Sequence, residues 1–430
     1  EYFDQTGAYN FSRVFGGNNK APVAIMPTWH LQAGKIENLY SGGNEGPMTS
    51  PVGLLMEINP EVPESLTVAQ AEAIKNKLVI ENVYGGCRKA DVHPLSSTGQ
   101  ELGSSEIQLP SEMLNPEGNP YQFPAGLSAR VLIYGGNITN VYGGNDVSGR
   151  VYGGNAVGIY HSIKGNVFGG GNGSYPYTDN TLLASDPHYG DFFYNKGSNS
   201  VDSLNDFRPN AEQVSIFVKG KEDNPTVIGG GIFCGGNSAT LKTTRSDAMV
   251  ELKIGSHVIA DKVFLGNNGE YMKQYENDND VLKLYSKYVN TDRSLTSTVI
   301  EGSKFNSLDM TDPTTFAKYM DGCALNLNPR VVFDANYVDY STYFGSFFCG
   351  GNVGSMTVSG KDGPTTISFD KKVIVYSKVV GGCNDAYINQ TTYNAAYQGG
   401  IIGSDGTGGT PNERTSYVDG SGNIKDRLVL

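Results

Sequence analysis

The sequence predicts an all-β fold: a single-stranded parallel β-helix (β-solenoid) with loop and short-helix insertions. Three observations predict it. Gly makes up 56 of the 430 residues, nearly twice the usual share of about 7%. A short tract of an aliphatic residue, an aromatic residue and Gly-Gly recurs along the chain. The Gly residues follow no three-residue period and helix-forming residues are not in excess, which excludes collagen-like and coiled-coil chains.

Each copy of this tract predicts a short strand that ends in a sharp corner. Val, Ile, Tyr and Phe favour a pleated strand, Gly-Gly permits positive φ, and the Asn that often follows tolerates the left-handed region. The copies occupy residues 14–18, 39–44, 83–87, 133–137, 141–145, 151–155, 167–172, 232–237, 347–352 and 379–383, with a degenerate copy at 263–267. Repetition of this kind indicates a chain that stacks one structural unit on the next.

The spacing of the copies indicates how the chain would wind. Gly236 and Asn267 lie 31 residues apart, as do Gly351 and Gly382, which is long enough for one coil of several short strands. The copies that begin at 133, 141 and 151 are too close together for whole coils, so we expect them on successive sides of neighbouring coils. Strands are also expected at 250–254, 366–369 and 373–376.

Stacked coils predict ladders of equivalent side chains about 4.8 Å apart, with Asn on Asn through amide hydrogen bonds and aromatic rings on aromatic rings. Four of the five cysteines fall in the repeat: Cys87, Cys234, Cys349 and Cys383. We expect these to be small, apolar members of a ladder. A disulfide between neighbouring coils is the alternative.

We expect one β-solenoid domain over residues 1–430, interrupted by insertions at about 45–82, 88–130, 173–213 and 268–330. The first insertion contains a predicted helix at about 65–77, begun by Pro63-Glu64, and the second is rich in Pro, Ser and Glu. The fourth contains two predicted helices, at about 280–288 and at 312–320, the latter capped by Asp312.

The charge pattern excludes two classes of partner. The formal net charge is −12, and no run of Lys and Arg exceeds two residues. Phosphate backbones and anionic lipid surfaces require a basic patch, so neither nucleic acid nor a membrane surface is expected as a partner. No apolar run approaches the roughly 18 residues that a membrane-spanning helix needs. We therefore expect no membrane insertion of this chain.

No motif in the sequence predicts catalysis or a cofactor. A Walker A sequence, a G-x-S-x-G elbow and an H-E-x-x-H pair are all missing, and the five histidines lack metal-ligand spacing. The acidic stretch 276–280 offers oxygen ligands for Ca²⁺, but it lacks the Gly and the distal Glu of an EF-hand loop. A solvated loop or a helix start explains this stretch better, so no catalytic or metal residue is assigned.

The insertion at 173–213 is the predicted binding region. Aromatic faces among Asn and Asp side chains suit sugar rings, which present C–H faces and hydroxyl edges, and loops on a rigid scaffold often carry function. The alternative is a satellite core under a long loop. The residues that we assign to binding are Tyr175, Tyr177, Tyr189, Phe192 and Tyr194.

The repeat tracts resemble those of Gly/Asn-rich, right-handed parallel β-helix proteins of the pectate-lyase-like superfamily. They are most similar to "VYGGGN" repeat proteins that gut Bacteroidetes secrete or display at their surface. The resemblance covers roughly half of the chain and implies an extracellular or outer-surface location. It is specific for architecture rather than for activity, because that superfamily includes both enzymes and adhesins.

Taken together, the sequence predicts a secreted or cell-surface, adhesin-like binding or scaffold protein without catalysis, directed at an extracellular glycan or at a host or bacterial surface protein. The alternative is a polysaccharide lyase or glycoside hydrolase of the β-helix type. At least three carboxylates converging with an Arg, Lys or His on one face would favour the enzyme. A third possibility is a stretch of a larger structural stalk.

Overall fold

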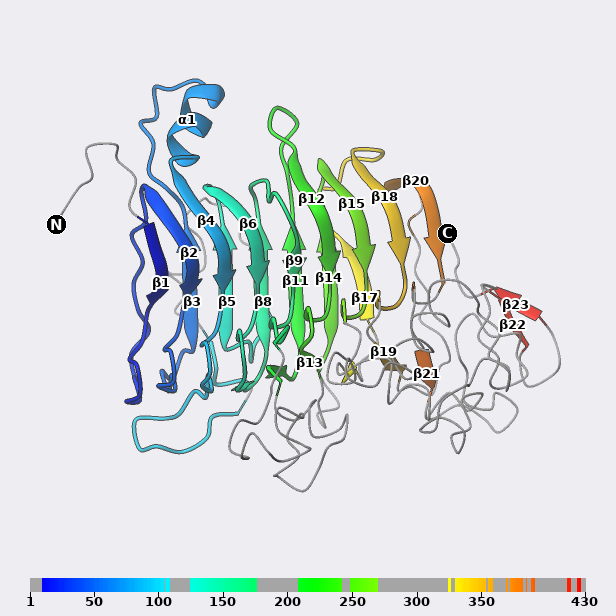
Figure 1. Cartoon of the computed structure of the whole chain (residues 1–430). Coiled ribbons are helices and arrows are strands. Elements are labelled where there is room, and N and C mark those ends of the chain that lie inside the picture. The colour runs from blue at the N-terminus through cyan, green and yellow to red at the C-terminus, as the bar shows by residue number, and fades with distance from the viewer. Residues whose placement is uncertain are drawn as a thin grey trace, which may run out of the picture.

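The structure of the chain is a computed structural model (Figure 1). It describes residues 10–103, 105–108, 124–175, 208–241, 248–269, 324–325, 329–352, 355–358, 369, 372–381, 384, 388–390, 416–418 and 424–426. These residues are almost entirely strands and turns, with one helix among them.

Most strands belong to three parallel sheets, here called A, B and C. Sheet A consists of β1 (Asn10–Phe15), β2 (Gly34–Tyr40), β4 (Leu78–Tyr84), β6 (Asn137–Tyr142), β9 (Val167–Phe168), β12 (Thr226–Phe233), β15 (Val258–Phe264), β18 (Thr342–Phe348) and β20 (Val373–Val380). Sheet B consists of β7 (Arg150–Val151), β10 (Asn210–Ala211), β13 (Thr240–Leu241), β16 (Ala324–Leu325), β19 (Ser355–Val358) and β21 (Ile388–Gln390). Sheet C consists of β3 (Leu54–Ile58), β5 (Ala129–Ile133), β8 (Asn155–Ile159), β11 (Val214–Val218), β14 (Val250–Ile254) and β17 (Pro329–Phe333). Near the C-terminus, β22 (Ser416–Val418) and β23 (Ile424–Asp426) pair antiparallel.

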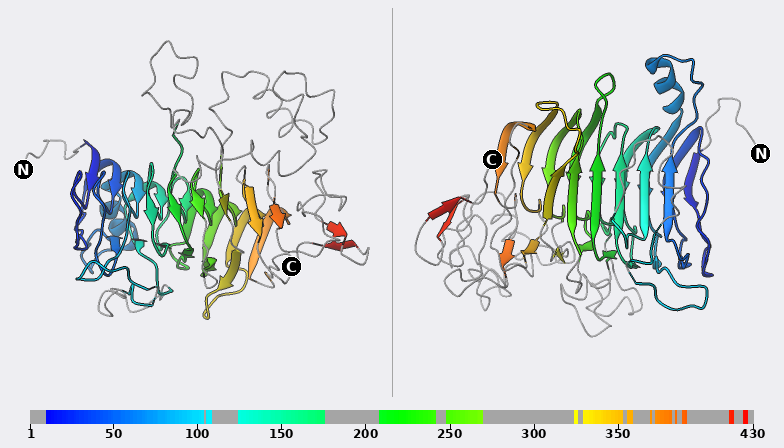
Figure 2. Two further views of the ribbon diagram at one scale, coloured as in Figure 1. Left: turned by 90° about the horizontal axis from the view of Figure 1, so that it is seen from below. Right: turned by 180° about the vertical axis from the view of Figure 1, so that it is seen from behind.

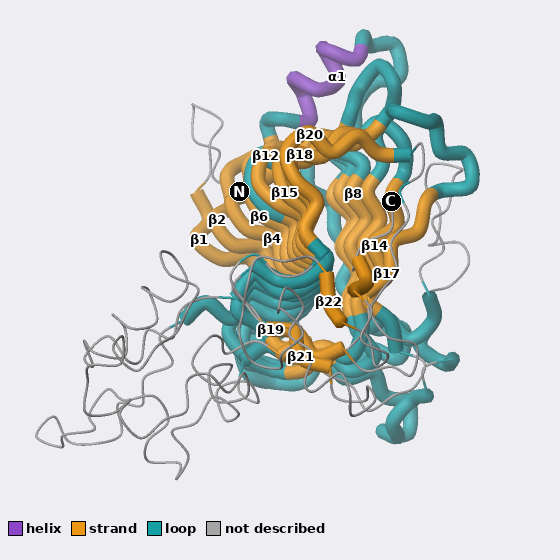
Figure 3. The backbone as a smooth tube through the Cα atoms, turned by 90° about the vertical axis from the view of Figure 1, so that its right-hand side faces the viewer, coloured by secondary structure: helices purple, strands orange, loops and turns teal. Residues whose placement is uncertain are grey.

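The chain visits the three sheets in turn, and one passage through A, B and C is here called a circuit. In every sheet the spatial order of the strands follows their order in the sequence, so each circuit lies beside the one before it (Figures 1 and 2). Viewed along the stack, sheets A and C face each other and sheet B lies at one end of both (Figure 3). The fold is thus all-β and parallel, an arrangement compatible with a β-solenoid.

The three closely spaced Gly-Gly copies lie on three different sheets, as predicted. The copy at 133–137 follows β5 in sheet C, the copy at 141–145 follows β6 in sheet A, and the copy at 151–155 follows β7 in sheet B. A spacing of 8 or 10 residues therefore separates successive sides of the stack and not successive circuits.

The core lies between the sheets and is built from side chains that alternate along each strand. In β3, Leu54, Met56 and Ile58 are fully buried, whereas Leu55 and Glu57 between them face outward. Parallel pairing places Ala129, Val131 and Ile133 of β5 directly beside the three buried residues. Burying one large aliphatic side chain contributes about 1.5–3 kcal/mol, and this column continues through the later circuits.

An unbroken ladder of aromatic rings ends the strands of sheet A. Consecutive ring centroids lie 4.5–4.8 Å apart with planes inclined by 5–16°, and all but the first ring are buried. This confirms the predicted stacking of aromatic on aromatic. The rings are those of Phe15, Tyr40, Tyr84, Tyr142, Phe168, Phe233, Phe264 and Phe348.

A ladder of Asn side chains runs beside the rings: Asn172, Asn237, Asn268 and Asn352 each follow a ring by four residues, and Asn384 follows Val380 of β20 by four. Every Nδ2 donates to the Oδ1 of the preceding circuit, at 3.0 Å from Asn384 to Asn352, 2.8 Å from Asn352 to Asn268, 2.6 Å from Asn268 to Asn237 and 2.9 Å from Asn237 to Asn172. The predicted amide ladder is therefore present, and its hydrogen bonds all point in one direction along the stack.

At two corners another Asn comes just before the ladder position, and it has a different role. Asn145 Oδ1 accepts a hydrogen bond from Cys87 N at 2.7 Å, and Asn267 Oδ1 accepts one from Gly236 N at 2.8 Å. Both side chains are buried and satisfy backbone donors of the preceding corner. The ladder residue is always the fourth after the ring position: it is the Asn directly after Gly-Gly at Asn172, Asn237 and Asn352, and the residue after that Asn where the corner is one residue shorter.

The described cysteines Cys87, Cys234 and Cys349 are free thiols and are buried, in agreement with the expectation of apolar ladder members. Burial raises the pKa of the Cys87 and Cys349 thiols to about 12. Cys323 and Cys383 lie outside the described residues. In the part of the chain that the structure describes, no helix is long and apolar enough to cross a membrane.

Helix α1 (Val68–Lys75) begins later than the sequence predicts. Thr67 caps it: Gln70 N donates to Thr67 Oγ1, and Thr67 N donates to Gln70 Oε1 at 3.0 Å, so this capping box overrides Pro63-Glu64 as the start. The helix lies beyond the ends of the strands (Figure 1). It is tied to later circuits by Lys75 Nζ, which donates to the Tyr134 carbonyl at 2.9 Å, and by Glu72, 3.4 Å from His161.

The expected insertions are shorter or lie largely outside the described residues. The stretch 45–82 holds β3 and most of β4, so only the part around α1 leaves the sheets. Within 88–130, Val92 forms parallel bridges with Met48 and Val151 and so continues sheet B. Most of 173–213 and 268–330, with the helices expected at 280–288 and 312–320 and the acidic stretch 276–280, is outside the described residues.

Candidate functional site

Of the five residues assigned to binding, the structure describes Tyr175. Tyr177, Tyr189, Phe192 and Tyr194 lie outside the described residues. Tyr175 is half-buried, and its hydroxyl donates to Asp146 Oδ1 at 2.7 Å. Asp146 holds the position in the Asn ladder that precedes Asn172. The one described residue of the predicted site is therefore tied to the ladder.

Asp146 is a buried carboxylate, 1% exposed, that accepts three hydrogen bonds from uncharged donors. Tyr40 Oη donates to Oδ2 at 2.7 Å, while Tyr175 Oη and Asn172 Nδ2 donate to Oδ1 at 2.7 and 2.9 Å. A carboxylate only accepts hydrogen bonds, so the amide ladder that donates toward the N-terminus ends here.

The residue one circuit earlier in the ladder is Arg88, which only donates. Its Nη1 donates to Asn44 Oδ1 at 3.2 Å, and Asn44 Nδ2 continues to Asn19 at 2.6 Å. In the ladder, each Asn Oδ1 accepts a hydrogen bond from the residue of the next circuit. An Asn at position 88 would receive none, because the Asp146 carboxylate has no N–H to donate. An Arg needs no such donor, so Arg88 and Asp146 together interrupt the ladder without leaving an unsatisfied amide.

The pKa values of the phenols around Asp146 are raised. For Tyr40, Tyr142 and Tyr175 burial is the largest cause, and the negative charge of Asp146 comes second. The pKa of Tyr84, between Tyr40 and Tyr142 in the ladder, is raised for the same two reasons. The fold therefore keeps these four phenols protonated well above the ordinary tyrosine value of 10.

These raised pKa values predict loss of stability at high pH. Below pH 10 the phenols are protonated in both states, so their contribution is fully present. Above about pH 10 the unfolded chain releases protons that the folded chain retains, and each ladder phenol lowers the free energy of unfolding by up to about 1.4 kcal/mol per pH unit. Urea denaturation between pH 9 and 11 measures this slope.

Tyr84→Phe is the matched variant, because Phe takes the same place in later circuits. Above pH 10 its free energy of unfolding should fall less steeply with pH than that of the parent, and the difference is the contribution of one phenol. A free energy of unfolding that stays constant up to pH 11 would contradict the burial of these hydroxyls.

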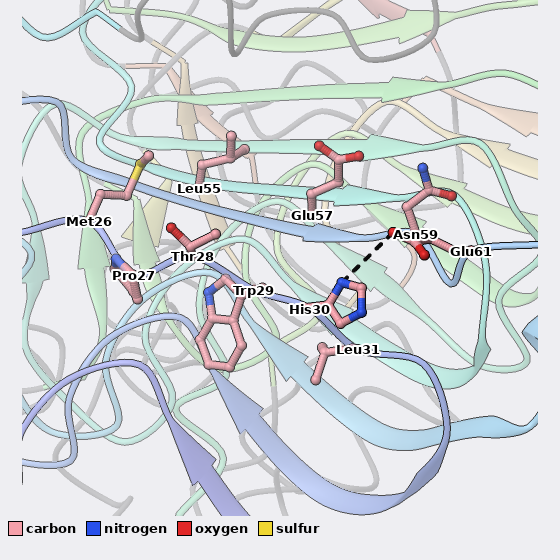
Figure 4. A pocket seen from close by; sticks show the side chains of 10 residues that line it. All are labelled: Met26, Pro27, Thr28, Trp29, His30, Leu31, Leu55, Glu57, Asn59 and Glu61. Atoms are coloured by element: carbon pink, nitrogen blue, oxygen red, sulfur yellow. Dashed lines mark ion pairs between the residues drawn. The ribbon is translucent and has the colours of Figure 1, made fainter.

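A groove lies between the segment 26–31 of the first circuit and the outward face of β3 (Figure 4). Its volume is about 390 Å³. One wall is formed by Trp29, His30 and Leu31, and the other by Leu55 and Glu57, which alternate with the buried residues of β3. Asn59 and Glu61 follow β3 and complete the rim. The groove thus combines apolar surface with carboxylate and amide side chains.

Trp29 is fixed in the groove wall by its packing. A Cβ on Gly16 would come within 2.7 Å of Trp29 Cζ2, so the indole lies directly on a glycine of the first corner. Its other contacts are with the core, yet its Nε1 is buried without a hydrogen-bond partner. An unsatisfied buried donor costs about 1–3 kcal/mol.

Sequence reasoning missed this groove, although one signal was present. Trp29 is the only Trp of the chain. Its partners on β3 follow about 26 residues later and face it only because the first two circuits lie side by side.

A second polar cluster lies on the outer face of sheet B, where three consecutive circuits meet. The ring of His93 stacks on Tyr152 at 3.8 Å, and the Arg150 guanidinium lies 4.6 Å from the centre of the same ring. Glu212 pairs with Arg150 and also accepts from Gly153 N at 3.0 Å.

Two further carboxylates belong to this sheet B cluster. Asp91 Oδ1 accepts from Arg150 N at 2.7 Å, and Glu101 lies 3.3 Å from His93 Nε2. Burial first, and then the charges of these carboxylates, raise the pKa of Tyr152, while Arg150 opposes them. Each charged group of the cluster has a partner, so the arrangement clamps three circuits together.

Within the described ranges, no three His, Cys, Asp or Glu side chains are grouped so that they could hold a metal ion. Comparison of the chain with protein-family models, with curated proteins and with solved structures finds no match. The groove, the Asp146 centre and the sheet B cluster therefore have to be interpreted from their own geometry.

Proposed function

We propose that the chain is a parallel β-solenoid similar to the pectate-lyase-like superfamily, and that it acts outside the cell or on its outer surface as a non-catalytic, adhesin-like protein that binds a glycan. The observation that carries the proposal is the groove beside β3, where the single indole of the chain faces carboxylate and amide side chains. The stacked circuits support a scaffold role, because they hold this groove on a stiff frame.

The groove has the chemistry that a sugar requires. An indole and the side chains of Leu31 and Leu55 offer apolar surface to the C–H face of a pyranose ring. Glu57 and Asn59 accept hydrogen bonds from hydroxyl groups, and the Asn59 amide also donates. A peptide would satisfy the apolar wall equally well, but it would present few of the hydroxyl donors that the rim is equipped to accept.

Because Trp29 is the only Trp, its fluorescence reports directly on the occupancy of the groove. Titration of the full chain with soluble host and plant glycans should shift or quench this emission for at least one glycan. Asn59→Ala should weaken that binding about tenfold, since a rim hydrogen bond is worth about 1 kcal/mol or more. Glu222→Gln, in an exposed turn after β11, is the control and should bind like the parent.

Two results would contradict this proposal. One is unchanged Trp29 emission with every glycan. The other is release of reducing or unsaturated ends at enzymatic rates, which would show catalysis.

The alternative, a polysaccharide lyase or glycoside hydrolase, would use the sheet B cluster. This cluster brings three carboxylates, an Arg, a His and a Tyr to one face, which is the combination that such chemistry draws on. The pairing of Arg150 with Glu212 and of His93 with Glu101 argues for the clamp instead. If the alternative holds, Glu212→Gln abolishes product release while the fold persists.

A further inference from the structure

We infer that the groove recognises the acetamido group of N-acetylated sugar units through the main-chain N–H of Leu55, at the edge of sheet C. The inference rests on the proposed function and names the class of ligand for the same site. It follows from the backbone beside the groove, which is independent of the side chains that make the groove suit a sugar.

Among the described residues, sheet C ends at β3, whereas the other two sides of the stack continue for one more circuit. In sheet A, β1 pairs with β2, and on the side of sheet B, Val23 forms a parallel bridge with Met48. On the third side, the segment 26–31 of the first circuit forms no such bridge in the described ranges, and the groove separates it from β3 (Figure 4). The groove therefore occupies the place that a first strand of sheet C would take.

The register of β3 decides which main-chain groups face the groove. Leu54 N donates to the Ser128 carbonyl at 2.7 Å, and the Ile58 carbonyl accepts from Tyr134 N at 2.8 Å, so Leu54 and Ile58 turn their main chain toward β5. Main-chain groups of successive residues point to opposite edges of a strand. Leu55 therefore directs its N–H away from β5, toward the groove, and within the described ranges no backbone acceptor is paired with it.

An acetamido group meets this edge as one peptide unit of a missing strand would. Its C=O is an amide carbonyl, the acceptor that a main-chain N–H meets in a sheet, and its N–H points the opposite way because the amide is trans. In the groove that direction leads to the wall formed by 26–31, where the Thr28 hydroxyl can accept. The methyl group packs on the apolar side chains of Met26 and Pro27. A plain hexose offers neither the amide carbonyl nor the methyl group.

A compact ligand is favoured over an extended peptide, because the two walls of the groove are joined at one end. Glu61 N donates to Gln32 Oε1 at 3.0 Å, and this bond links the segment after β3 to the first circuit. A peptide added as a strand along β3 would have to pass this link, whereas a sugar unit ends before it. The groove volume of about 390 Å³ is also near the lower end of the range for ligand pockets, about 300–1,000 Å³.

The test is a fluorescence titration of Trp29 in the full chain with two oligosaccharides of equal length and linkage, one of hexose and one of N-acetylhexosamine. We expect the N-acetylated one to bind about tenfold more tightly or better. Leu55→Pro removes the N–H at an edge position that tolerates Pro, and it should reduce this preference to about threefold or less. Leu55→Ala is the matched control. It keeps the N–H, so both sugars should bind more weakly while the preference persists.

Hydrogen exchange of the Leu55 amide gives a second measurement, which needs no variant and holds if Leu55→Pro does not fold. This amide should exchange rapidly in the free chain and about tenfold more slowly or less when the N-acetylated oligosaccharide saturates the groove. The Leu54 amide, which donates to Ser128, is the internal reference and should exchange slowly in both states. A Leu55 amide whose exchange the bound sugar leaves unchanged would overturn the inference.

The outcomes separate this inference from the proposed function. Equal affinities for the two oligosaccharides, or a preference that Leu55→Pro retains in full, overturn the inference and leave glycan binding in place. Emission that neither these oligosaccharides nor any other glycan changes overturns both. A third titrant is an extended peptide with acetylated and amidated ends. If it binds more tightly than the N-acetylated sugar, the edge of β3 serves to add a strand, and both proposals for the groove are wrong.

Discussion

Gly143→Ala is expected to destabilise the protein by about 3 kcal/mol or more, or to prevent folding. A Cβ at this corner would lie 2.3 Å from the carbonyl oxygen of Gly169 and 2.8 Å from Val157 Cγ2. The first of these atoms is backbone of the neighbouring circuit. It cannot move aside without breaking the 2.9 Å hydrogen bond from Gly143 N to the Phe168 carbonyl.

Gly103→Ala is the matched control for this substitution. The nearest atom to its added Cβ is the Glu106 carboxylate at 3.1 Å, the far end of a side chain that can turn away. Its effect should stay within about 0.5–1 kcal/mol. Urea denaturation of the two variants measures the difference, and equal stabilities would mean that neighbouring circuits are not packed as closely as the structure has them.

Asp146→Ala is expected to cost about 3–6 kcal/mol, because it leaves two buried donors, at about 1–3 kcal/mol each, and one half-buried donor without an acceptor. The donors are the hydroxyls of Tyr40 and Tyr175 and the amide of Asn172. Asp146→Asn should cost much less, since its oxygen still accepts from Asn172 and its amide can donate to a phenol oxygen. The free energy of unfolding from chemical denaturation distinguishes these two variants.

Asp223→Ala, in an exposed turn, is the control for the loss of a carboxylate and should be nearly neutral. If Asp146→Ala and Asp223→Ala have the same stability, the three hydrogen bonds to Asp146 contribute nothing to the fold. An Asp146→Asn variant as unstable as Asp146→Ala would show instead that the negative charge matters, and not the number of acceptors.

The strands of sheet A could be predicted because their signals are local. An aliphatic residue, an aromatic residue and Gly-Gly determine a strand and its corner within five positions, and stacking then follows from repetition. This is why Tyr40, Tyr84 and Tyr142 are found in one ladder as expected. The predicted Asn ladder is present as well, and its members Asn172, Asn237 and Asn352 directly follow Gly-Gly in the tract.

Other features depend on contacts between distant parts of the chain. Strand β3 ends without Gly-Gly, so its alternating Leu54, Met56 and Ile58 were assigned to an insertion. The acceptor role of Asp146 emerges only when the circuits are aligned and its position falls in the Asn ladder. The groove requires residues of two circuits, and sequence spacing alone does not bring Trp29 next to Glu57.

The central claim is that successive circuits stack in register, and a distance between spin labels tests it most directly. Glu37 and Asp261 are exposed, and each lies three residues before a ladder ring, Tyr40 and Phe264. Five strand spacings of about 4.8 Å separate these two positions along sheet A. Labels at both positions, with Cys323 and Cys383 replaced by Ser, should give a narrow distance distribution near 24 Å by double electron–electron resonance. A broad distribution would contradict the stacked arrangement. So would a narrow one whose centre differs from 24 Å by more than the length of the label linkers.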